Sequence, residues 1–140
     1  MATFNKFESF ASHYCSGFHD LSASGSLLKY YLANDAPSAS GDTVKTDLAD
    51  ITNENGYTGP VDTENTQAYA SGIYTVNLSA KTVTASGGAI PTFRYVVLYD
   101  DTPSDPVDPL IGWWDRGSTL DLADGDAFGM HPEASLLTFG

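Results

Sequence analysis

Two apolar runs on either side of an Asp- and Pro-rich loop constrain the fold of this chain most. The runs cover residues 93–99 and 110–114, and each is too short for a typical helix. Both are rich in β-branched and aromatic residues, which pack well on a pleated sheet. Pro103, Pro106 and Pro109 lack the N–H that a strand ladder needs, so they mark a loop between the runs. The pattern predicts an antiparallel pair of strands at the centre of a sheet.

Short strand signals recur along the rest of the chain. The alternation of Tyr74, Val76 and Leu78 with polar residues predicts a strand with one buried face. Further strands are expected over residues 27–33, 66–70, 73–78, 81–85, 119–122, 127–130 and 136–139. The Asp124-Gly125 pair is a turn signal typical of a β-hairpin. Because 13 glycines and 7 prolines favour many turns, we expect a mainly β fold: an antiparallel β-sandwich, jelly-roll-like, or a barrel.

The N-terminal segment is predicted to form a short helix. Apolar residues recur there at spacings of three and four and give one face over residues 3–15: Phe4, Phe7, Ala11 and Tyr14. Phe10 lies off that face and would widen it. Two interpretations of this face stay open, namely packing on the chain's own sheet and docking on a neighbouring subunit. A short helical turn is also expected over residues 47–51.

The length of the chain indicates how many domains it forms, and its charge limits the partners that it can bind. We expect one domain over residues 1–140, with a helical arm over residues 1–20 and a β core over residues 25–140. The chain has 18 acidic and 6 basic residues, so an anionic nucleic acid or membrane surface would repel it. It shows neither a signal-peptide pattern nor an apolar run long enough for a membrane span. We therefore expect no nucleic-acid partner and no membrane partner.

Candidate catalytic and metal-binding residues are few. His13, Cys15 and His19 lie close in sequence, but no zinc motif surrounds them, and Cys15 is the single cysteine. The acidic segment 121–126 contains a fragment of a calcium loop without the closing Glu of an EF-hand. A second acidic group follows the first apolar run: Asp100, Asp101, Asp105 and Asp108. No phosphate loop or nucleophile elbow occurs, so we expect no enzyme activity, no cofactor and no metal.

Adjacent tryptophans and the N-terminal phenylalanines are the candidate interface residues. Trp113 and Trp114 follow one another in a predicted strand, so their side chains are expected to point to opposite faces. One tryptophan is expected in the core. The other would anchor a protein interface, be covered by a loop or helix, or stack on a sugar. The candidate interface set is Phe4, Phe7, Phe10, Trp113 and Trp114.

Several segments resemble a group of small structural proteins of tailed bacteriophages. They are TFNKFESF, LKYYLANDAP, LADIT, NGYT and FRYVVLYDD…DPLIGWWDRGS…LADGDAF. The resemblance runs with gaps from Thr3 to Phe128, and the His-Pro-Glu segment at residues 131–133 departs from the pattern. It implies a virion protein and carries over no catalytic residue. Small acidic β-rich virion proteins are often capsid decoration (cement) proteins, which bind the head shell as homo-oligomers, frequently trimers.

Three functional hypotheses follow. The first is a capsid decoration protein, made in the host cytoplasm and located in the virion, with the major capsid protein and further copies of itself as partners. The second is a tail, fibre or head–tail component, which copy number per particle distinguishes from the first. The third is a carbohydrate-binding module for host attachment, which would need an exposed Trp or Tyr platform beside acidic hydrogen-bond acceptors.

Overall fold

The computed structural model describes residues 2–22 and 25–139. Within these residues the chain is mainly β, with antiparallel sheets and one α-helix near the N-terminus, so the predicted fold class is confirmed. The elements in chain order are β1 (Phe4–Lys6), α1 (Glu8–Cys15), β2 (Leu28–Ala33), the 3-10 turn η1 (Lys45–Asp47), β3 (Val61–Asp62), β4 (Thr66–Ala70), β5 (Ile73–Asn77), β6 (Lys81–Thr84), β7 (Ile90–Asp100), β8 (Leu110–Leu122), β9 (Ala127–Met130) and β10 (Leu137–Phe139).

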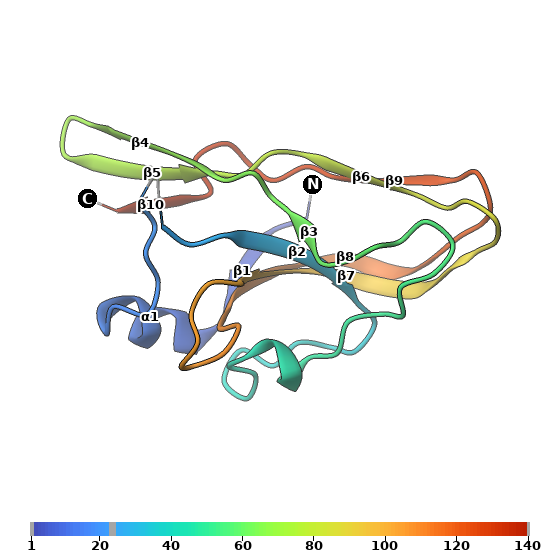
Figure 1. Cartoon of the computed structure of the whole chain (residues 1–140), viewed down its shortest axis with the longest axis horizontal. Coiled ribbons are helices and arrows are strands. Elements are labelled where there is room, and N and C mark those ends of the chain that lie inside the picture. The colour runs from blue at the N-terminus through green and yellow to red at the C-terminus, as the bar shows by residue number, and fades with distance from the viewer. Residues whose placement is uncertain (1, 23–24, 140) are drawn as a thin grey trace.

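The strands form three sheets in two layers. The large sheet has five strands in the order β1-β8-β7-β2-β3, so the predicted antiparallel pair, β7 and β8, is central in it. A three-stranded sheet, β10-β5-β4, and a two-stranded sheet, β6-β9, lie along one face of the large sheet (Figure 1). Helix α1, turn η1 and the loop between β7 and β8 lie on its other side (Figure 1). The result is a sandwich with a helix and loops below it.

The central part of the large sheet is buried on both faces, which explains the apolar residues at 95–99 and 110–114. Alternate residues of β2 and β7 enter two separate hydrophobic clusters. The cluster toward the small sheets includes Tyr30, Leu32, Phe93, Val96 and Leu98, with Val76, Val83 and Met130 packed from above. The cluster toward the loops includes Tyr31, Ala33, Val97, Tyr99 and Leu110, covered by Phe7 and Leu48. Side chains on both faces of these strands are buried, and the strands are rich in apolar residues for that reason.

Strand β8 contains a bulge beside Gly112. The register runs from Tyr99 opposite Leu110 to Leu98 opposite Gly112, which leaves one extra residue in β8. Beyond the bulge, Trp113 joins the cluster on the loop side and Trp114 joins the cluster on the small-sheet side. The prediction that the two tryptophans point to opposite faces is therefore confirmed.

Gly112 also decides where β1 can lie. A Cβ atom at this position would overlap the ring of Phe4 and the backbone carbonyl of Asn5. We expect Gly112→Ala to lower the free energy of unfolding by about 1–3 kcal/mol, because an overpacked site forces its neighbours apart. Urea denaturation measures the loss, and hydrogen exchange should show faster exchange over Phe4–Lys6. An unchanged denaturation midpoint would show that β1 does not need a glycine at position 112 in order to pair with β8.

The predicted helix over residues 3–15 is wrong in its start and in its buried face. Phe4–Lys6 forms β1, which pairs with β8, and α1 begins at Glu8. Phe10, placed off the predicted face, is the buried residue of the helix, whereas Ala11 is exposed. Hydrogen bonding to the open edge of β8 stabilises residues 4–6 as a strand, and this outweighs the weak helix propensity of so short a segment. The arm is thus part strand and part helix.

Other predicted elements need smaller corrections. The turn at Asp124-Gly125 does not form a hairpin, because it joins β8 in the large sheet to β9, which pairs with β6. The stretches predicted separately at 110–114 and 119–122 form one strand, β8. The expected helical turn at 47–51 occurs earlier, as η1. The predictions at 27–33, 66–70, 73–78, 81–85, 127–130 and 136–139 agree with the structure to within one residue at each end.

Candidate functional site

The five predicted interface residues pack within this chain. Phe7, Phe10 and Trp114 are only 1%, 5% and 8% exposed, and Phe4 and Trp113 are partly buried. The ring centroids of Phe4 and Trp114 are 4.8 Å apart, and those of Phe7 and Trp113 are 4.6 Å apart. The arm therefore packs on the chain's own sheet, and its docking on a neighbouring subunit stays a prediction. Phe7 and Phe10 leave no free surface for a neighbouring subunit.

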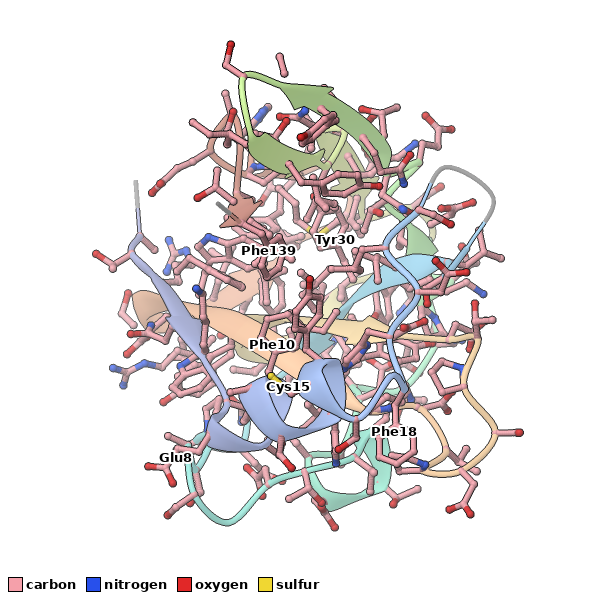
Figure 2. The ribbon with its side chains drawn as sticks, turned by 90° about the vertical axis from the view of Figure 1, so that its left-hand side faces the viewer. Glu8, Phe10, Cys15, Phe18, Tyr30 and Phe139 are labelled. Atoms are coloured by element: carbon pink, nitrogen blue, oxygen red, sulfur yellow. The ribbon has the colours of Figure 1, made fainter. Side chains whose placement is uncertain are left out.

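Helix α1 closes one end of the sandwich. Figure 2 shows Phe10 pointing from α1 toward Phe139 and Tyr30, between the two layers. Tyr14 stacks on Phe139 with a centroid distance of 4.6 Å and an interplanar angle of 9°. Cys15 is exposed and free. The helix therefore contributes aromatic cover to the core, and its thiol takes no part in that packing.

A buried histidine–aspartate pair ties the segment after α1 to the end of β7. His19 Nδ1 and Asp100 Oδ2 are 2.8 Å apart, and both side chains are fully buried. Asp100 Oδ1 also accepts a hydrogen bond from the Thr102 backbone N–H. The ring of His13 lies 6.2 Å from that of His19, and burial together with this neighbour lowers the pKa of His13. The structure thus brings His13 and His19, two of the candidate residues from the sequence, close together.

The pKa of His13 predicts a loss of stability on acidification. Because folding lowers this pKa, the unfolded chain binds the proton more readily. The stability that neutral His13 contributes is present above its unfolded pKa of about 6.5 and is lost as the pH falls through the folded value. An NMR titration should give His13 a pKa below that of a model peptide, and His13→Gln should reduce the fall in unfolding free energy between pH 7 and 5. A pKa at or above the peptide value would contradict the assignment.

The acidic loops use their carboxylates to hold turns. Asp124 accepts a hydrogen bond from the Gly87 N–H, and Asp126 accepts one from the Ala123 N–H. Asp101 pairs with Lys29 at 2.7 Å. Within residues 2–22 and 25–139, no three His, Cys, Asp or Glu side chains group as a metal ion would require.

The most exposed apolar side chains of the β layers lie on a hairpin that carries no charge. Residues 66–80, the uncharged hairpin, contain no Asp, Glu, Lys, Arg or His. Its turn, Ser71-Gly72, has positive φ at both residues, as a two-residue hairpin turn requires. Tyr69 and Ile73 flank this turn and are 71% and 48% exposed. The hairpin lies at one end of the molecule, in the upper layer of Figure 1.

Strand β4 of the uncharged hairpin is an open sheet edge. It pairs with β5 alone and is the longest edge strand of the three described sheets. The backbone N–H and C=O groups along its outer side are therefore free to pair with another strand. The sequence predicted both strands of the hairpin but not its place at an edge, although the uncharged run was visible in the sequence.

A cavity of about 600 Å³ lies between the large sheet and β9. Its walls are formed mainly by Tyr30, Val96, Trp114, Phe128 and Met130, with Asp115, Arg116 and His131 as the polar contributors. The indole N–H of Trp114 is buried without a hydrogen-bond partner. The cavity could not be predicted from the sequence, because its walls come from β2, β7, β8 and β9, and their placement depends on how the two layers pack.

Comparisons of the chain with protein-family models, with curated proteins and with solved structures find no match. Among the described residues, no helix has the length and apolar character needed to cross a membrane. The uncharged hairpin, the cavity and the charge distribution are the features of the molecule from which a function can be inferred.

Proposed function

We propose that the protein is a structural protein of a bacteriophage virion that decorates the outer capsid shell as a homo-oligomer. The observation that carries the proposal is the uncharged hairpin on a chain of net charge −12. Copies of so acidic a chain repel one another over most of their surface, so they associate best where charge is absent. The uncharged hairpin offers such a place, with two exposed apolar side chains.

The open edge of β4 supplies the directional part of the contact. An extended segment of a neighbouring copy can add to this edge through backbone hydrogen bonds, as in other cases of strand addition. Tyr69 then supplies the kind of side chain that dominates protein interfaces. The combination favours assembly through this hairpin over assembly through the N-terminal arm, whose Phe7 and Phe10 are buried.

The core and the charge support the same role. A decoration protein must keep one shape while it occupies many identical sites on a shell. The large sheet, which is packed on both faces, provides a rigid body of that kind. The acidic exterior keeps the protein from binding nucleic acid.

Quantitative mass spectrometry of purified virions tests the proposal. Hundreds of copies per particle are expected for a protein that covers the shell. A handful to a few dozen copies would support the second hypothesis, a tail, fibre or head–tail component. Absence of the protein from purified particles would rule out both virion roles.

The carbohydrate-binding hypothesis gains less support. Trp114 is 8% exposed and Trp113 is partly buried against Phe7, so neither forms an exposed platform for a sugar ring. Among the described aromatic side chains Tyr69 is the most exposed, at 71%, so it is the strongest candidate for such a site. Binding on a glycan array that is lost in Tyr69→Ala would revive this hypothesis.

A further inference from the structure

We propose that the cavity between the large sheet and β9 binds a small apolar molecule with one anionic group, such as a medium-chain carboxylate. Its volume of about 600 Å³ falls in the range of small-molecule sites, about 300–1,000 Å³. The inference goes beyond the proposed virion role and does not depend on it.

The walls of the cavity suit an apolar body. Tyr30 from β2, Val96 from β7 and Trp114 from β8 line it on the side of the large sheet. Phe128 and Met130 from β9 line it on the opposite side. An alkyl chain or aromatic ring placed there leaves water for a largely hydrocarbon environment, which is the main source of affinity in such sites.

One donor in these walls lacks an acceptor. Trp114 is 8% exposed, and its ring packs against Phe4 and Tyr30. Its buried indole N–H has no hydrogen-bond partner. Among the other described side chains that line the cavity, no buried polar atom lacks a partner. Buried N–H groups are nearly always paired in folded proteins. Because the nitrogen atom is itself enclosed, Trp114 offers the cavity the surface of its ring.

The uncompensated charge beside the cavity is positive. Asp115 lines the cavity, but the Arg94 guanidinium binds both of its oxygens, at 2.7 and 3.0 Å. Arg116 also lines the cavity, and its Nη1 donates to Ser118 and to the Thr119 carbonyl. In the described part of the chain, no carboxylate lies within ion-pair distance of Arg116. On a chain with only 6 basic residues, this local cation selects an anionic head group.

Calorimetric titration with sodium octanoate tests the site. We expect one octanoate per chain and an affinity about tenfold higher than that of 1-octanol, which has the same alkyl chain without the charge. Acetate, which has the head group alone, should not bind. No heat of binding and no rise in melting temperature at millimolar octanoate, with folded protein, would overturn the proposal.

Two variants separate the head-group contact from a general charge effect. Arg116→Gln should weaken octanoate binding about tenfold and leave 1-octanol binding unchanged. Lys29→Gln makes the same change of charge at a residue that does not line the cavity, so it should change neither affinity. If both variants weaken octanoate equally, or if neither does, the anion-binding part of the proposal is wrong.

The Trp114 indole resonance provides a readout that does not require a variant. Octanoate should shift the Trp114 Nε1–H proton signal, because the ligand packs against the ring of Trp114 in the cavity wall. Trp113 lies outside the cavity walls and serves as the internal control. Equal shifts of both indole signals, or a shift of Trp113 alone, would contradict the placement of the ligand.

Discussion

Under the proposed function, replacing Tyr69 and Ile73 together with Asp is expected to abolish self-association of the protein and its binding to the capsid shell. Both side chains are exposed on the uncharged hairpin, so the change places two negative charges where like-charged copies would meet. Like charges brought together at an interface cost several kcal/mol, which exceeds the stability of many weak contacts. Sedimentation velocity measures the loss of oligomer, and sedimentation with particles that lack the protein measures the loss of shell binding.

A control variant with one added charge at another exposed apolar residue shows whether the position of the charge matters. Val107 is an exposed apolar residue, at 59%, in the loop between β7 and β8, away from the hairpin. Val107→Asp should leave association unchanged. Both proteins should unfold within about 0.5 kcal/mol of the wild type per substitution, because these are surface changes. If the double variant associates as tightly as the wild type, then the uncharged hairpin is not the site of self-association.

Replacing Asp100 with Ala is expected to destabilise the fold by about 3–5 kcal/mol, a large part of the about 5–15 kcal/mol that holds a typical domain folded. The carboxylate is fully buried and is the hydrogen-bond partner of His19 Nδ1 at 2.8 Å. His19 Nε2 has no other partner to compensate. The backbone N–H of Thr102 loses its acceptor as well. Urea denaturation, followed by circular dichroism, gives the change in unfolding free energy.

The neighbouring residue provides the control. Asp101 pairs with Lys29 at 2.7 Å, but both side chains are partly exposed. Exposed ion pairs contribute about 0–1 kcal/mol, so Asp101→Ala should cost little. If Asp100→Ala costs no more than Asp101→Ala, then the buried pair does not hold the helical arm to the sheet.

The central strands could be predicted from the sequence because burial on both faces leaves a direct trace in composition. The runs at 93–99 and 110–114 are mostly apolar for that reason, with Arg94 as their one charged residue, and the prolines between them mark the loop. The sequence of the N-terminal arm contains no comparable pattern that would indicate a strand. Phe4 has a spacing to Phe7 that suits a helix, but its actual partners are Trp114 and Gly112, more than a hundred residues later. Such a contact overrides local preference and is invisible in a local pattern.

The candidate sites depended even more on distant contacts. His19 and Asp100 are 81 residues apart in sequence, and only the folded chain shows that they form a pair. The strands of the uncharged hairpin followed from alternating residues, but the open edge of β4 depends on β10 pairing with β5. The cavity likewise requires β9 to lie opposite the large sheet, whereas the turn at Asp124-Gly125 suggested that it would pair with β8. Local turn chemistry does not decide which sheet a strand joins.

Cryo-electron microscopy of the purified virion tests whether this protein decorates the capsid shell through the uncharged hairpin. We expect regular density over the whole shell, into which the sandwich fits with β4 against a neighbouring copy. Density confined to one vertex or to the tail, or a shell contact made by a different face with β4 exposed to solvent, would contradict it.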